Sequence, residues 1–218
     1  MADGSELSLI LIFLTLSPVV LLTLILLAMN EFGNGTAQCI EKSCSKNLHK
    51  GIKLSKFVKR ATAELIKTYV RTSSLGNFAE QFCTMSMDSM PSSTLWGSSP
   101  AERLQSAYIR LTELLPHVTM VLQQQSDLNP YLGSLLSDLA RLVIHGRHLA
   151  LRLSCILQKL QPNVALPEPA VGPTALLPPQ NIFQQKVYGC AVLTRVQKLT
   201  LLTARELKSL RGQCTDKT

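Results

Sequence analysis

The fold of this chain depends on a short stretch, Gln125-Ser126-Asp127-Leu128-Asn129-Pro130, which separates two long segments of helical periodicity. Only residues 126–129 lie in the gap. Asn129 followed by Pro130 is a typical helix start, because asparagine caps a helix and proline suits its first turn. A gap of about four residues forces the two helices to be antiparallel neighbours.

The helices on either side of this gap are expected at about 100–125 and 130–160. The first of them opens with Ser99-Pro100-Ala101-Glu102, in which Ser99 and Glu102 can form a reciprocal capping box. Both segments repeat leucine, isoleucine or valine at intervals of three and four residues, which is typical of an amphipathic helix.

Two more helical segments flank this pair, at about 45–71 and 181–210. A gap of nearly thirty residues precedes the central pair, and the gap that follows it contains six prolines between Pro162 and Pro179. Gaps of this length can cross a whole bundle. The order long, short, long predicts an all-α, long-chain four-helix bundle with up-up-down-down topology and two long crossover loops.

The N-terminal part of the chain has no charged residue from Leu7 to Met29. We interpret 1–35 as a secretory signal with a short lead-in, and 36–218 as the bundle domain. The alternative is a membrane-anchored helical protein, because about 20 apolar residues can span a bilayer. The sequence Asn34-Gly35-Thr36 is a glycosylation acceptor, which fits a secreted chain.

All six cysteines follow this apolar run, and none belongs to a CxxC pair. Such spacing favours three disulfides in an oxidising compartment over a zinc site. In the predicted topology Cys83 and Cys190 lie at one end of the bundle and should form a bond. The other four lie at the opposite end, where three pairings remain open. We choose Cys44–Cys155 with Cys39–Cys214, because the extreme ends of the domain should meet.

Two segments carry a resemblance to a known family: 39–48, with the sequence CIEKSCSKNL, and 182–190, with the sequence IFQQKVYGC. Through them the chain resembles the family of leukaemia inhibitory factor, oncostatin M and ciliary neurotrophic factor, which are interleukin-6-type long-chain helical cytokines. It looks most similar to leukaemia inhibitory factor. It departs from that pattern at Gln158, where a second cysteine would stand three residues after Cys155.

The resemblance implies a secreted cytokine that binds and brings together cell-surface receptor subunits. These would be a leukaemia-inhibitory-factor-receptor-like chain and the signalling subunit shared by the interleukin-6 group, and JAK-STAT signalling would follow inside the cell. We expect the free protein to be a monomer.

The resemblance also implies a primary site at the start of the last helix. In the family a phenylalanine and a lysine there contact the leukaemia-inhibitory-factor receptor, and they correspond to Phe183 and Lys186. Residues three apart share one helix face. An exposed aromatic beside a cation suits an interface hot spot. The competing interpretation is that Phe183 only packs the preceding loop against the core and Lys186 is solvated.

A second receptor surface, for the shared signalling subunit, lies on helices one and three in this family. No short motif carries over to it, so only outward positions can be named. On helix three these are Arg141, His145, His148 and Arg152. The candidates that we select across both helices are Phe57, Lys50, Lys53, His148 and Arg152.

No motif in the sequence indicates an enzyme. There is no phosphate loop, no HExxH and no nucleophile elbow, so we expect no catalytic residue and no cofactor. His145 and His148 are three residues apart but lack a nearby acidic or cysteine ligand, so no metal site is predicted. Beyond residues 1–29 the chain carries 22 basic and 12 acidic residues. That charge suits acidic receptors or heparin-like polyanions, whereas nucleic acid fits a secreted chain poorly.

Overall fold

The structure is a computed structural model, and it describes residues 39, 43–85, 87, 90–163, 165–166 and 180–214. The predicted signal segment and the acceptor Asn34 lie outside the described residues. Within the described part of the chain, no helix combines the length and the apolar character needed to cross a bilayer.

Four long helices form the bundle. Their bounds are α3 (Cys44–Thr72), α5 (Pro100–Leu128), α6 (Gly133–Leu160) and α7 (Ile182–Ser209). Each begins and ends within three residues of its predicted bounds. A 3-10 turn, η1 (Gly76–Phe78), and a short helix, α4 (Ala79–Thr84), lie in the first crossover, where only a loop is expected from sequence. A second 3-10 turn, η2 (Leu210–Gly212), follows α7.

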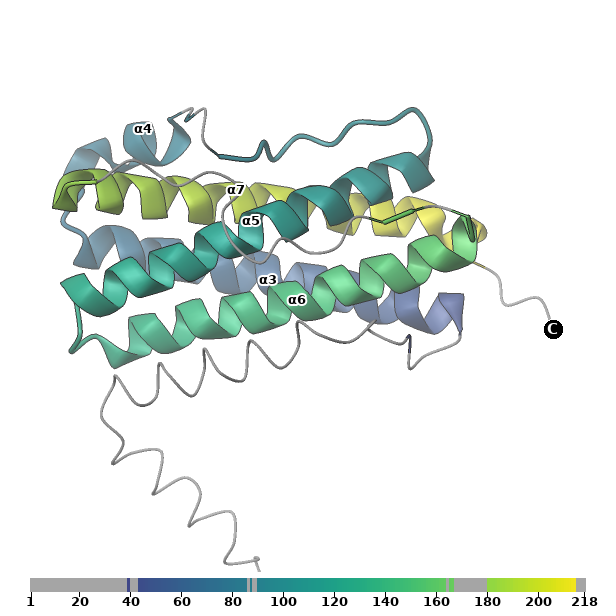
Figure 1. Ribbon diagram of the computed structural model, residues 1–218, viewed down its shortest axis with the longest axis horizontal. Coiled ribbons are helices and arrows are strands. Elements are labelled where there is room, and N and C mark those ends of the chain that lie inside the picture. Colours follow the sequence, from purple (N-terminus) through teal and green to yellow (C-terminus); the bar gives the residue numbers. More distant parts are fainter. Residues whose placement is uncertain are drawn as a thin grey trace, which may run out of the picture.

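The helices lie side by side along the long axis of the molecule (Figure 1). Helix α3 packs mainly against α6 and α7, and α5 packs mainly against the same two, so α3 and α5 are diagonal to each other. The short turn after Leu128 reverses the chain between α5 and α6. Disulfides join the start of α3 to the ends of both α6 and α7. The up-up-down-down topology is therefore confirmed.

The disulfide pairing is partly as expected. The Cys83–Cys190 bond is present, joining α4 to α7. The predicted pair of bonds Cys44–Cys155 and Cys39–Cys214 is wrong, because the structure contains Cys39–Cys155 and Cys44–Cys214. Cys44 is fixed in the first turn of α3, which contacts η2 and so lies beside Cys214. Cys39 precedes the helix and reaches the end of α6 instead.

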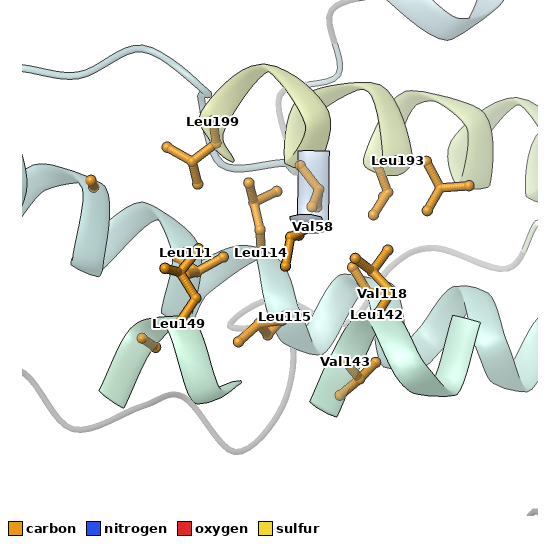
Figure 2. Packing of buried hydrophobic residues seen from close by; sticks show 14 of the residues in the cluster. Val58, Leu111, Leu114, Leu115, Val118, Leu142, Val143, Leu149, Leu193 and Leu199 are labelled. Carbon is orange, nitrogen blue, oxygen red and sulfur yellow. The ribbon is translucent and has the colours of Figure 1, made fainter. Parts of the chain in front are cut away.

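Apolar residues of all four helices fill one core, of which Figure 2 shows the central part. It includes Val58 of α3, Leu114 and Val118 of α5, Leu142 of α6 and Leu193 of α7, all at most 3% exposed. Burying such side chains contributes about 1.5–3 kcal/mol each. The buried stripe of each helix leaves its opposite face for solvent or for partners.

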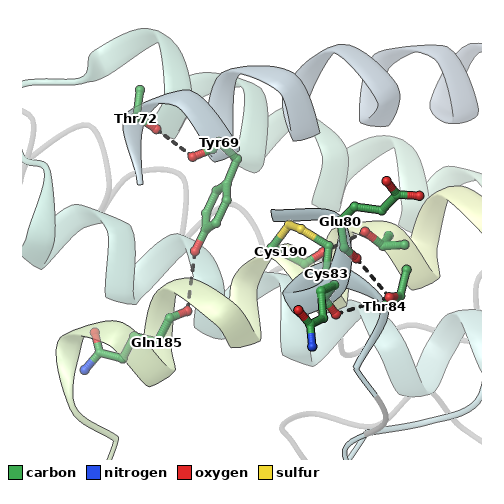
Figure 3. Close-up of a disulfide and its surroundings, with 9 residues drawn as sticks. Tyr69, Thr72, Glu80, Cys83, Thr84, Gln185 and Cys190 are labelled. Atoms are coloured by element: carbon green, nitrogen blue, oxygen red, sulfur yellow. Dashed lines mark hydrogen bonds between the residues drawn. A yellow bond between two sulfur atoms is a disulfide. The ribbon is translucent and has the colours of Figure 1, made fainter. Parts of the chain in front are cut away.

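A polar network lies inside the end of the bundle that carries Cys83–Cys190. The hydroxyl of Tyr69 accepts a hydrogen bond from Gln125 Nε2 at 3.1 Å and donates one to the Gln185 carbonyl at 3.4 Å. Figure 3 shows the latter bond beside the disulfide. Burial raises the pKa of Tyr69, so the hydroxyl stays protonated. The absence of a side chain at Gly189 makes room for the Tyr69 ring.

Gly189→Ala should lower the free energy of unfolding by about 1–3 kcal/mol, the usual cost of overpacking a core. The added methyl group would overlap the Tyr69 hydroxyl and press on Val121. Chemical denaturation measures the loss. Gly133→Ala is the matched control, because its methyl group would meet nothing within 4 Å. Equal stability of the two variants would contradict the close packing at Gly189.

Stability should also fall in mild acid because of His117. Its ring is 3% exposed, and its Nδ1 lies 2.6 Å from the Tyr188 hydroxyl. Burial, helped by the positive charge of Arg195 and opposed by Glu113, lowers the pKa of His117. The unfolded chain takes up a proton near pH 6.5 while the folded chain does not. The stabilisation is therefore complete above pH 6.5 and is lost as the pH falls below it.

Denaturation curves at pH 7, 6 and 5 test this dependence. One proton accounts for at most about 1.4 kcal/mol per pH unit. His117→Gln should flatten the pH dependence, whereas His49→Gln, at an exposed position of α3, should leave it in place. If the free energy of unfolding of His117→Gln still falls with pH as steeply as that of the unchanged protein, other groups cause the acid sensitivity.

Candidate functional site

The first turn of α7 is positioned by a capping box at Asn181. Its side chain accepts a hydrogen bond from the Gln184 backbone at 2.9 Å, and the Gln184 side chain accepts one from the Asn181 backbone at 2.9 Å. This reciprocal pair begins the helix sharply after the proline-rich crossover. Ile182 and Phe183 therefore lie in an ordered first turn, and they are 59% and 52% exposed.

Phe183 packs edge to face on Phe82 of α4, with ring centroids 5.3 Å apart. Phe82 in turn lies 6.2 Å from Phe78 of η1, which is 64% exposed. We call Phe78, Phe82 and Phe183 the aromatic row. Phe183 thus contacts α4 in the first crossover, and half of its surface stays open to solvent. The competing interpretation concerns the loop that precedes α7, most of which lies outside the described residues.

Lys186 follows Phe183 by three residues and is partly exposed. This spacing places the two side chains on one helix face. Lys186 forms no ion pair within the part of the chain that the structure describes. A cation without an internal partner, beside a half-open aromatic ring, can contact a surface that carries an acidic group and an apolar patch.

Helix α4 and the residue after it are held against α7 by two contacts that follow Phe82 in the chain. Cys83, the next residue, is bonded to Cys190 in α7. Further along, Arg195 donates to the Met85 carbonyl at 3.3 Å. These links fix the position of Phe82, and through it the orientation of the Phe183 ring. The sequence pattern did not reveal this support, because Phe82 and Phe183 are far apart in the chain and α4 has no extended periodicity.

The second predicted surface lies between α3 and α6. Phe57 is 39% exposed and meets the His145 ring edge to face at 5.0 Å. The two rings border a hollow of about 180 Å³, which Asp138 and Arg141 also line. Burial, reinforced by the positive charges of His148 and Arg141, lowers the pKa of His145. The hollow is edged by the two aromatic rings and by two acidic side chains and one basic side chain.

The other candidates for this surface differ in their surroundings. Lys50, Lys53 and His148 are exposed, and the His148 ring lies 6.4 Å from that of His145. Arg152 instead donates to Asn47 Oδ1 at 2.8 Å and so ties α6 to the first turn of α3. No group of three potential metal ligands occurs among the described residues.

A comparison with protein-family models finds a match to the LIF / OSM family over residues 48–206. This range covers most of the chain, from the first turns of α3 to the last turn of α7. The chain belongs to the LIF / OSM family. It is therefore a helical cytokine whose relatives bind cytokine receptor chains and are not enzymes. No curated protein and no solved structure gives a significant match to this cytokine.

Proposed function

We propose that this cytokine is secreted and brings together two receptor chains at the cell surface. One is a leukaemia-inhibitory-factor-receptor-like chain, and the other is the signalling subunit shared by the interleukin-6 group. Their assembly triggers JAK-STAT signalling inside the cell. The observation that carries the proposal is the half-exposed Phe183, supported from behind by Phe82 and flanked by Lys186.

The support of Phe183 matters for affinity. Ordering a free side chain on binding costs about 0.5–1.5 kcal/mol, and a ring already held by a neighbour avoids part of that cost. Lys186 adds a charge that selects partners with a complementary acidic group. The aromatic row is therefore a preorganised contact for the receptor-like chain.

The geometry also supports two receptors bound at once. The aromatic row lies at the α4–α7 end of the bundle, whereas Phe57 and the hollow lie between α3 and α6. These surfaces belong to different helix pairs, so each can be contacted by a different receptor chain. We assign the hollow to the shared signalling subunit.

The test uses cells with a STAT-responsive reporter that express either receptor chain alone or both together. Purified cytokine should activate the reporter only in cells that express both. A response with one chain, or none with two, would contradict the proposal. N-terminal sequencing of the protein from conditioned medium tests secretion separately. We expect a chain that begins near Thr36, and retention in membranes with Met1 intact would exclude a cleaved signal.

A further inference from the structure

The basic residues of the chain gather on two neighbouring helices. Helices α3 and α7 together carry 13 lysines and arginines and two glutamates, whereas α5 carries two basic and three acidic residues. Because α3 and α7 pack against each other, this excess of positive charge belongs to one side of the bundle.

On α3, two exposed cations lie on the side away from α6. Phe57, Ala61 and Glu64 line the hollow against α6 and mark that edge of the helix. Each residue turns the helix by about 100°, so Lys56 lies about 100° and Arg60 about 60° from Phe57, both toward α7. Both are exposed, as is Lys53, which lies on the outer face of the helix between the directions of Phe57 and Arg60.

On α7 the exposed cations lie away from α5. Glu206 marks the α5 edge, because it pairs with Arg103 of α5 at 2.9 Å. The exposed residues Lys198, Arg205 and Lys208 occupy the outer face and the α3 edge.

The two sets of cations lie level with each other. A side chain at Gly51 of α3 would contact Leu207 of α7, which sets the register of these antiparallel helices. Arg60 follows Gly51 by the same number of residues as Lys198 precedes Leu207, so Arg60 and Lys198 stand at the same height. Lys53 and Arg205 match in the same way. We call the two rows the basic face: Lys53, Lys56, Arg60, Lys198, Arg205 and Lys208.

No acidic residue of α3 or α7 neutralises the basic face. Glu64 pairs with Lys67 at 2.9 Å, and Glu206 pairs with Arg103. In the described part of the chain, none of the six cations forms an ion pair. The large apolar side chains exposed on these two helices are Phe57, Ile182 and Phe183, and none of them belongs to the basic face.

We propose that the basic face binds a sulfated glycosaminoglycan of the heparan sulfate type. Two parallel rows of cations, about 15 Å long from Lys198 to Lys208, match a linear polyanion lying along the helices. Its binding gains free energy from the release of condensed counterions, as for other linear polyanions. A membrane surface is the poorer fit, because interfacial binding needs apolar side chains to insert beside the charges.

The basic face is separate from the aromatic row. Lys198 lies about 22 Å along α7 from Phe183, so glycan and receptor can be bound together. Glycan binding by the basic face would retain the cytokine near the cells that produce it, and this role rests on the proposed secretion. The binding itself does not depend on either receptor.

The test measures affinity for a heparin-derived dodecasaccharide by titration calorimetry at 150 mM salt and above. The triple variant Lys198→Gln, Arg205→Gln, Lys208→Gln should bind at least tenfold more weakly, with a shallower salt dependence. The control Arg71→Gln, Arg141→Gln, Lys159→Gln removes the same charge from exposed positions elsewhere and should bind within twofold of the unchanged protein.

Several outcomes would overturn the proposal. The first is an equal loss of dodecasaccharide affinity in both triple variants. The second is no loss of affinity in the triple variant of α7. The third is no binding of the dodecasaccharide by the unchanged protein. Binding to phosphatidylserine vesicles that depends on the α7 cations, without dodecasaccharide binding, would assign the face to membranes. A Phe183→Ala, Lys186→Ala variant should retain full dodecasaccharide affinity, so a failure of the receptor proposal remains distinguishable from a failure of this one.

Discussion

Replacing Phe183 and Lys186 together by alanine should weaken binding to a leukaemia-inhibitory-factor-receptor-like chain by about 100-fold or more, roughly 3 kcal/mol. The aromatic ring is half exposed at the tip of the bundle and already held by Phe82. Its loss removes a preordered apolar contact, and the loss of Lys186 removes the neighbouring charge. Neither side chain belongs to the buried core, so the fold should remain intact.

Surface plasmon resonance with the immobilised receptor ectodomain measures the change, and circular dichroism checks the fold. Phe57→Ala is the matched control, because it removes another partly exposed helical phenylalanine, on the α3–α6 side of the bundle. It should leave this receptor's affinity unchanged and reduce binding of the shared signalling subunit. If the double variant keeps its affinity within threefold, the primary site lies elsewhere.

Removing the Cys83–Cys190 bond, by serine at both positions, should lower the free energy of unfolding by about 2–5 kcal/mol and also weaken receptor binding. The bond closes a sequence separation of 107 residues and holds α4 on α7. Without it α4 is a six-residue helix with little stability of its own. Its detachment would withdraw Phe82 from the Phe183 ring.

The Cys39–Cys155 bond provides the control for this prediction. Its separation of 116 residues is similar, so its removal should destabilise the chain comparably. It lies at the opposite end of the bundle, and receptor affinity should therefore be preserved at temperatures where both variants are folded. Equal losses of affinity in the two variants would mean that the effect is global rather than local to α4. Thermal unfolding and receptor binding are both required to separate these cases.

The long helices and their topology could be predicted because their signals are local. Ser99 and Asn181 cap helices with their own neighbours, and the short turn before Gly133 leaves only one arrangement for α5 and α6. The pairing of the four cysteines at one end could not be predicted. All four lie within reach of one another there, and the choice depends on how α3 meets η2.

The candidate site divides in the same way. Phe183 and Lys186 occupy one helical turn, so their shared face follows from spacing alone. The support from Phe82 is a tertiary contact made by a helix too short to show periodicity, and sequence patterns carry no sign of it. The place of His145 against Phe57 likewise requires the register of α3 and α6.

All three disulfides join residues more than one hundred positions apart, and this separation governs how the chain matures during its synthesis. Cys39 cannot form its native bond until Cys155 has been synthesised, and translation of the residues between them takes on the order of ten seconds. Cys44 waits longer still, for Cys214. Throughout this interval Cys39 and Cys44 are each other's nearest thiols along the chain. Correct oxidation is therefore a late event, and any bond formed earlier between Cys39 and Cys44 has to be exchanged before the native pairs can form.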